Sequence, residues 1–327
     1  MDFKFLQKYI YMIAIVGTTG ILYRKYNDYQ NTHTSKENYQ LIRKYLLNDT
    51  SLVKNNKPII WIHLPYEFNA RDWESFGSRG SHDLNAPYLY LTIKSIIQKC
   101  SNSFHICLID DDSFGKLLSD WNIDLGKVND PLLSNVRTLG IMKTLYEFGG
   151  LYLPPSFLCK KNLKTLFEEG TKNDKVFVCE AVSRNITSEL QTLYPSTNFI
   201  GCNKKNETIL NLIRFIEVLI SQDPTNYSKF NGSIEKEIFN NYASKSTRII
   251  SGTNIGTKTD EGDAIILDDL MSSGELELSC KCYGIYIPHK ELSERTAYQW
   301  FLKLQMKDIF EANIAIANEI TKVLTPK

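Results

Sequence analysis

The sequence lacks an excess of charge of either sign, and beyond its N-terminus it lacks long apolar runs. Its 327 residues carry 38 Lys and Arg against 37 Asp and Glu, a formal net charge of +1. A protein dedicated to nucleic acid needs a basic surplus to displace counterions from phosphates, so we predict no nucleic-acid partner. No later stretch reaches the length of a membrane-spanning helix, which excludes a protein that crosses the membrane several times. Hydrophobic residues make up 43% of the chain, enough for a sizeable folded core.

Several catalytic and metal-binding motifs are also missing. The chain contains no G-x-S-x-G turn, no H-E-x-x-H helix and no C-x-x-C pair. Hydrolase and zinc-enzyme functions therefore have no motif to support them. The seven cysteines are scattered and odd in number, so we expect buried free thiols and no disulfide framework.

The N-terminus carries an uncharged, largely apolar stretch over residues 9–23, with basic residues on both sides. At 1.5 Å per residue this stretch alone falls short of a hydrocarbon layer of about 30 Å, and residues 5–8 extend it. We predict a single-pass membrane anchor through residues 5–23, within an N-terminal segment 1–26. A cleaved signal peptide and a helix buried in the globular domain are the alternatives. The basic residues flank both ends, so the topology is not set by charge.

Five N-x-[ST] sequons permit a luminal location without establishing it. They begin at Asn48, Asn185, Asn206, Asn226 and Asn231.

A polar segment follows the anchor. Residues 34–37 form a capping box with helical spacing after it, so we predict a stalk helix and linker over 27–56 and a globular domain over 57–327. The domain alternates apolar runs rich in β-formers with stretches of helical periodicity. The predicted strands are 59–64, 104–109, 151–153, 175–182 and 198–202, and the predicted helices are 86–100, 113–121, 130–148, 206–221 and 307–323.

This order of elements predicts an α/β fold with a mostly parallel sheet flanked by helices. In such sheets, ligands bind at the carboxyl ends of the strands. His63 ends the first predicted strand. There it contacts a ligand, or it is a core histidine whose ring nitrogens are hydrogen-bonded within the protein. Asp110–Asp112 follow the second strand. They bind a divalent cation, or Asp111 or Asp112 caps the next helix while the others are solvated. Arg79 lies in a long Ser- and Gly-rich loop, where it binds phosphate or is simply solvated.

One segment resembles a known family. Leu145–Leu153, an apolar helix end followed by Phe-Gly-Gly-Leu-Tyr, resembles sugar transferases of the GT-A fold, of the α-mannosyltransferase and capsular-polysaccharide transferase type. Lys57–Leu64 is similar to the first strand of that family, and Asn198–Gly201 is similar to the segment after its metal site. The resemblance implies a nucleotide-sugar donor, a glycan acceptor and a D-x-D motif whose metal holds the donor's diphosphate. The chain also resembles uncharacterised proteins of large DNA viruses.

The chain departs from this family at the metal site. Where the family has D-x-D, this chain has Pro154-Pro155-Ser156, so both metal-binding carboxylates are missing and we predict that the metal site is lost. Other cations then have to neutralise the diphosphate leaving group. Arg79, Arg137 and Lys143 are the candidates.

Two functional hypotheses follow. The first is a membrane-anchored glycosyltransferase, of hexosyltransferase type, that uses a nucleotide-sugar donor. The second is a catalytically inactive GT-A-like structural or interaction module, a pseudoenzyme. A displaced D-x-D at Asp110 and Asp112, binding Mn²⁺ or Mg²⁺, is an alternative to metal-free donor binding. The similarity to viral proteins suggests a host endomembrane or the virion as the location. Under the first hypothesis no catalytic base is identified, and the residues that contact the nucleotide-sugar are His63, Arg79, Asp110, Asp112, Arg137 and Lys143.

Overall fold

A computed structural model describes residues 57–64, 86–222, 226–243 and 245–325. The predicted anchor and stalk over 1–56 lie outside these residues, as does the loop over 65–85 that carries Arg79. Among the described residues, no helix is both long enough and apolar enough to cross a bilayer.

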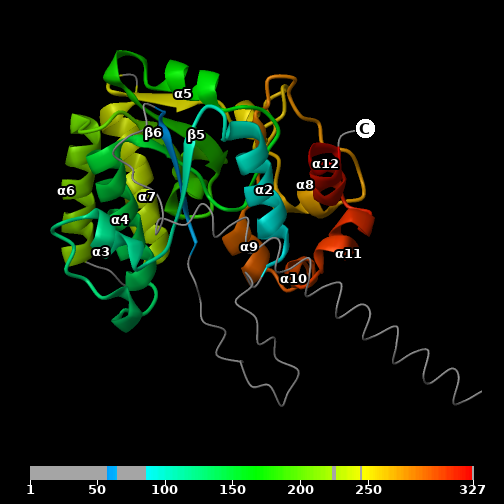
Figure 1. Cartoon of the computed structure of the whole chain (residues 1–327), viewed down its shortest axis with the longest axis horizontal. Coiled ribbons are helices and arrows are strands. Elements are labelled where there is room, and N and C mark those ends of the chain that lie inside the picture. The colour runs from blue at the N-terminus through cyan, green and yellow to red at the C-terminus, as the bar shows by residue number, and fades with distance from the viewer. Residues whose placement is uncertain (1–56, 65–85, 223–225, 244, 326–327) are drawn as a thin grey trace, which may run out of the picture. The chain divides into compact units, whose positions relative to one another are not determined.

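Within the described residues, six strands form one sheet in the order β2-β1-β3-β6-β5-β7 (Figure 1). β1 pairs in parallel with β2 and β3, β5 pairs in parallel with β7, and β6 is antiparallel to both of its neighbours. All strands except β6 therefore point the same way, which confirms the predicted mostly parallel α/β sheet. The strands are β1 (Ile59–His63), β2 (His105–Ile109), β3 (Gly150–Tyr152), β5 (Val176–Val182), β6 (Leu193–Cys202) and β7 (Thr247–Ile250).

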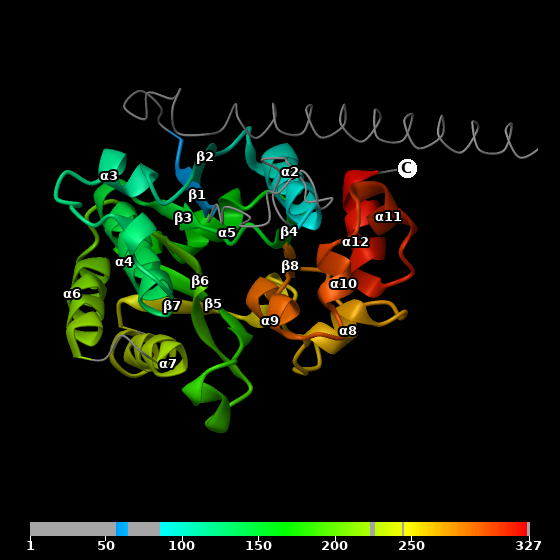
Figure 2. The ribbon, with the colours of Figure 1, turned by 90° about the horizontal axis from the view of Figure 1, so that it is seen from below.

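Helices cover both faces of this sheet (Figures 1 and 2). One side holds α3, α4, α6 and α7, and the other holds α2 and the helices from α8 to α12. Coverage on both faces explains why β1 and β2 read as continuous apolar runs. The helices named in this article are α2 (Tyr88–Cys100), α3 (Ser113–Leu117), α4 (Leu132–Phe148), α5 (Lys164–Gly170), α6 (Glu207–Gln222), α7 (Tyr227–Glu237), α8 (Leu267–Met271), α9 (His289–Glu294), α10 (Gln299–Leu302), α11 (Met306–Glu311) and α12 (Ala315–Leu324).

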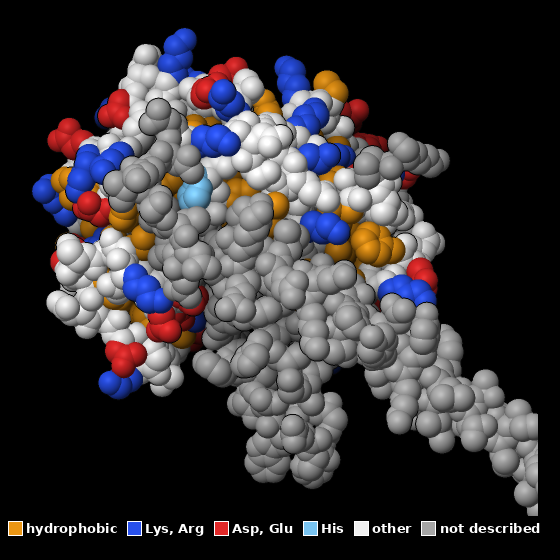
Figure 3. Space-filling view, in the orientation of Figure 1, with side chains coloured by type: hydrophobic (Ala, Val, Ile, Leu, Met, Phe, Trp, Pro, Cys, Tyr) orange, Lys and Arg blue, Asp and Glu red, His pale blue; other side chains and the backbone are white. Residues whose placement is uncertain are grey.

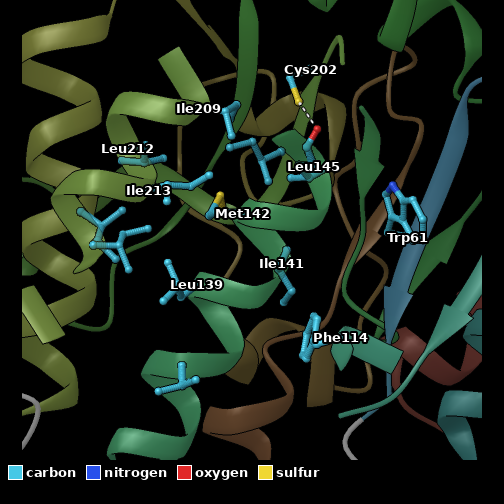
Figure 4. Packing of buried hydrophobic residues seen from close by; sticks show 14 of the residues in the cluster. Trp61, Phe114, Leu139, Ile141, Met142, Leu145, Cys202, Ile209, Leu212 and Ile213 are labelled. Carbon is cyan, nitrogen blue, oxygen red and sulfur yellow. Dashed lines mark hydrogen bonds between the residues drawn. The ribbon is translucent and has the colours of Figure 1, made fainter. Parts of the chain in front are cut away.

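The first layer is held by apolar packing between α4 and α6 (Figure 4). Met142 and Leu145 of α4 pack in one cluster with Ile209 and Leu212 of α6, and each of the four is at most 2% exposed. Complete burial of such a side chain contributes about 1.5–3 kcal/mol, so this contact fixes α4 against the sheet.

The second layer contains a separate two-stranded antiparallel sheet, β4 (Phe157–Cys159) with β8 (Gly284–Tyr286). Its core joins α2 to the C-terminal helices through buried residues such as Leu158, Ile285 and Phe301.

Two glycines set the turn from α4 into β3. Gly149 and Gly150 have φ values of 67° and 108°, a region that other residues rarely adopt. A Cβ atom at Gly150 would lie 2.3 Å from the carbonyl oxygen of Ile59. The Gly-Gly pair therefore has a local structural cause, the close approach of β3 to β1.

The predicted single helix over 307–323 is wrong. The chain forms α11 and α12 instead, because Ala312 and Ile314 adopt extended conformations between them. The Ala315 amide donates to the Ser272 carbonyl at 2.7 Å, and the break allows Ile309 and Ile314 both to be buried.

Candidate functional site

The carboxyl ends of the parallel strands lie side by side at one end of the sheet, called the carboxyl edge below. His63 ends β1, Asp110 follows β2, Leu153 follows β3 and Ser183 follows β5. The antiparallel β6 starts at this same edge, because Leu193 pairs with Val182. The sequence prediction placed the ligand site here, and the structure brings His63 together with Asp111, which follows the next strand.

A closed ion-pair network occupies the β1–β2 part of this edge. Arg137 of α4 donates to both carboxylate oxygens of Asp111, from Nε to Oδ1 at 2.9 Å and from Nη2 to Oδ2 at 2.7 Å. His63 Nε2 donates to Asp111 Oδ1 at 2.9 Å. The His63 ring stacks on Phe114, with ring centroids 5.3 Å apart.

The electrostatics of this network favour the ionised carboxylate. Burial alone would raise the pKa of Asp111, but the hydrogen bonds and charges of His63 and Arg137 outweigh it and lower the pKa to about 2. The His63 side chain is 5% exposed and that of Arg137 is 14% exposed. Both groups are therefore committed to Asp111, and the core-histidine interpretation of His63 describes this structure best.

Asp110 and Asp112 have different surroundings in this structure. Asp110 Oδ1 accepts from the Ser113 amide at 2.9 Å and from the Ser113 hydroxyl at 2.6 Å. Asp112 is exposed and makes no capping hydrogen bond to α3. Asp110, and not Asp111 or Asp112, therefore binds the start of α3, which differs from the predicted cap. The predicted helix also ends early, at Leu117, because Leu118 turns into an extended conformation.

The other predicted cations do not converge with Arg137. Lys143 lies further along α4 and pairs with Glu217 of α6 at 2.7 Å. It follows Arg137 by six residues, which places it on a different face of the helix. Arg79 lies outside the described residues.

The Pro154-Pro155-Ser156 turn after β3 does not fit a divalent cation. Ser156 is 1% exposed, and its hydroxyl donates to the Ile287 carbonyl at 2.7 Å. The Pro155 carbonyl accepts from the Thr92 hydroxyl at 2.6 Å. These groups join β3 to α2 and β8, and residues 154–156 themselves offer no carboxylate to a cation. Over the described part of the chain, no group of three or more His, Cys, Asp or Glu side chains is placed to hold a metal ion.

A large cavity lies elsewhere along the same edge, and the sequence analysis missed it. Its volume is about 610 Å³. Its walls come from the end of β5, the start of β6, α7 and the segment from β8 through α9. Figure 2 shows α7 and α9 on either side of β5. Hydroxyl, amide, carboxylate and basic groups all line this cavity, which makes it suited to a polar ligand with many hydrogen-bonding groups.

Glu235 of α7 is the most perturbed acid in this cavity. The residue is 9% exposed, and its Oε2 accepts from Asn185 Nδ2 at 2.8 Å and from Thr187 Oγ1 at 3.3 Å. Burial raises the pKa of Glu235 to about 7, and these two hydrogen bonds offset only part of that effect. A carboxyl group with a pKa near neutrality in a cavity is a functional-site candidate.

Three of the five sequon asparagines serve as local caps. Asn185 accepts from the Thr187 amide, Asn206 from the Thr208 amide and Asn226 from the Lys229 amide. The Asn-x-Ser/Thr spacing at these positions therefore has a structural cause, which weakens its value as a sign of glycosylation.

Charged side chains of both signs share the visible surface. On the face shown in Figure 3, basic and acidic side chains are interspersed where the surface is not grey, and the visible basic groups form no continuous field.

Comparisons with known proteins found similar solved structures only. No protein-family model and no curated protein matches the chain. Solved structures that resemble it include the glycosyltransferase GlyE of Streptococcus pneumoniae TIGR4, at 15% identity and a TM-score of 0.38, over 61% of this chain and 46% of GlyE. The galactosyltransferase LgtC, crystallised with donor and acceptor sugar analogs, resembles it at 12% identity and a TM-score of 0.34, over 60% of this chain and 74% of LgtC. Mouse xyloside xylosyltransferase 1 does so at 7% identity and a TM-score of 0.38, over 60% of this chain and 86% of that protein.

These likenesses have TM-scores below 0.5, and the chain spans less than half the length of GlyE. They establish no substrate or activity for this chain. The strand order and the position of the cavity at the carboxyl edge come from its own structure.

Proposed function

We propose that the chain is a glycosyltransferase-like protein that binds a nucleotide-activated sugar and a glycan at the carboxyl edge of its sheet, with no metal held by the Pro154–Ser156 turn. The cavity of about 610 Å³ beside the ends of β5 and β6 carries the glycan-binding part of this proposal. It lies where open α/β sheets bind ligands, and its walls offer the dense hydrogen-bonding groups that a sugar requires.

Donor binding in this proposal cannot depend on Arg137 or Lys143 as free cations. Asp111 neutralises the first and Glu217 the second. Arg79 is the remaining predicted cation for the diphosphate. The proposal keeps the single-pass anchor through residues 5–23 and a location in a host endomembrane or the virion, both of which rest on the sequence alone.

A donor titration tests this function. The full chain is titrated with UDP-sugars and GDP-sugars, with and without Mn²⁺, while its thermal unfolding is followed. A donor at about 100 times its dissociation constant adds about 2.7 kcal/mol to the stability of the folded state. We expect a stabilisation that does not require Mn²⁺. A shift only with Mn²⁺ that Asp110→Asn abolishes would instead support the displaced D-x-D, and the absence of a shift with every donor would count against the function.

A structural or interaction module without catalysis is the second candidate, and the Pro154–Ser156 turn favours it. Proline stiffens the chain there, and the turn's polar groups bond to α2 and to the residue after β8. This candidate predicts a chain that folds stably and responds to no donor in the same titration.

A further inference from the structure

The charged groups that line the cavity differ in whether they have ion-pair partners. Arg184 pairs with Glu291 at 2.8 Å, and Arg295 pairs with both Glu291 and Asp268. Burial lowers the pKa of Lys290, and the charges of Glu294 and Asp130 oppose this effect. The two arginines of the cavity therefore already pair with carboxylates, which favours an uncharged ligand over an anion.

Glu235 differs from these groups, because only neutral donors hold it among the described residues. Asn185 and Thr187 both donate to its Oε2. Its Oε1 accepts from no described residue in these bonds and is not among the fully buried unpaired atoms of the described residues, so it is open to the cavity. Asn185 also has its own amide oxygen engaged by Thr187, so this donor pair is fixed in place. A carboxyl group that is nine-tenths buried and bonded on one oxygen can accept a further hydrogen bond from a ligand hydroxyl on the other.

The rest of the lining matches a sugar. Tyr286 contributes a partly exposed aromatic ring, while Asn198, Ser228 and Asn231 contribute amide and hydroxyl groups. Such a ring can pack against the apolar face of a pyranose, and the amides and hydroxyls can pair with its hydroxyls.

We propose that this cavity is the subsite for an uncharged glycan, in which Glu235 Oε1 accepts a hydrogen bond from a sugar hydroxyl. This inference rests on the proposed function and names the chemistry of its acceptor. It assigns to Glu235 a binding role that can be measured without any transfer reaction.

The test uses the full chain and a panel of neutral oligosaccharides, namely mannotriose, cellotriose and N-acetylchitotriose, with sialyllactose as the anionic comparison. Saturation-transfer NMR detects binding at millimolar concentration, and calorimetry measures the dissociation constant. We expect at least one neutral glycan to bind and sialyllactose to bind more weakly. Glu235→Gln should weaken the neutral glycan about tenfold, because a hydrogen bond to a charged group is lost.

The dependence on pH gives a second readout. Glu235 accepts best as the carboxylate, so the wild-type affinity should rise between about pH 5 and about pH 9 and become flat in Glu235→Gln. The other groups that face this position are Tyr194 from β6, Arg184 before the η6 turn (Ile186–Glu189), and Lys290, Glu291, Glu294 and Arg295 from α9 and its end. The substitution leaves all of them in place, so they cannot produce the difference between the two profiles.

Two further variants complete the design. Glu168→Gln removes an exposed carboxylate of α5 outside the cavity lining and should bind as the wild type does. Ser228→Trp puts a large ring into the cavity and should abolish binding without touching Glu235.

The proposal is overturned if no neutral glycan binds, if Ser228→Trp leaves binding intact, or if Glu235→Gln binds as tightly as wild type at every pH. The donor titration stays separate from this test. A chain that binds a nucleotide-sugar but no glycan here would keep the proposed function and lose this inference.

Discussion

Replacing Asp111 with Asn should destabilise the fold, because Asp111 holds two buried basic groups. Its pKa falls from an ordinary 3.8 to about 2, a difference of about 1.8 pKa units, which at 1.36 kcal/mol per unit corresponds to about 2 kcal/mol. Asp111→Asn also leaves Arg137, whose side chain is 14% exposed, without its counter-charge. Breaking a buried pair costs about 3–5 kcal/mol, and the partial exposure of Asp111 reduces this value, so we expect a loss of about 2–4 kcal/mol.

Urea unfolding at neutral pH, followed by circular dichroism, measures this loss as a lower midpoint at unchanged slope. Asp112→Asn is the matched control, because the Asp112 carboxylate lies next to Asp111 in the sequence but is exposed and makes no capping bond to α3. It should change stability by less than about 0.5 kcal/mol. Because the folded-state pKa of Asp111 is depressed, its contribution is complete above about pH 4 and disappears as the pH falls through about 2.

Equal stability of the two variants would refute this reasoning. Asp111 would then have to be free of His63 and Arg137 in solution, and all three would again be available to a ligand.

Three more outcomes are expected from the same structure. Ser156→Asp restores a carboxylate at the D-x-D position, but it buries an unpaired charge. Calorimetry should therefore show a loss of folding stability of about 3 kcal/mol or more, which Mn²⁺ does not restore. Restored stability with Mn²⁺ would contradict the account of the turn. The raised folded-state pKa of Glu235 makes its ionisation costly, so the wild type should lose about 3 kcal/mol of stability as the pH rises from about 4.5 to about 7. Glu235→Gln should not show this loss. Parallel pH profiles of the two proteins in urea unfolding would contradict this prediction. Gly150→Ala should cost at least about 2 kcal/mol in thermal unfolding, whereas Gly115→Ala, with nothing within 4 Å of the added methyl, should be near neutral; similar midpoints would contradict the role of the Gly-Gly turn.

The sequence predicted most of the sheet, because several of its strands, β1 and β2 above all, are runs of apolar residues. The runs that became β1 and β2 could pack only with both faces covered, and the helical periodicity between them fixed a parallel connection. The first half of β6 was missed because Leu193–Ser196 includes Pro195 and reads as a turn. Its strand conformation comes from pairing with β5 across a register shift after Val178, which is a tertiary contact.

The candidate site was harder to predict, because charge partners depend on which elements meet. Arg137 read as a cation for a phosphate, and its partner Asp111 lies 26 positions away on another element. The cavity draws on segments from Ala181 to Arg295, and no local motif marks such an assembly. The nearest signal was Asn185 with Thr187, which read as a sequon and turned out to hold Glu235.

Hydrogen–deuterium exchange with and without a saturating nucleotide-sugar tests the central claim most directly, because it shows which edge of the sheet receives the ligand. Protection is expected at the carboxyl edge, around residues 153–156, 183–187 and 193–198. Protection confined to the opposite edge, around residues 172–176 and 202–206, would contradict the account, and so would no protection from any donor that binds.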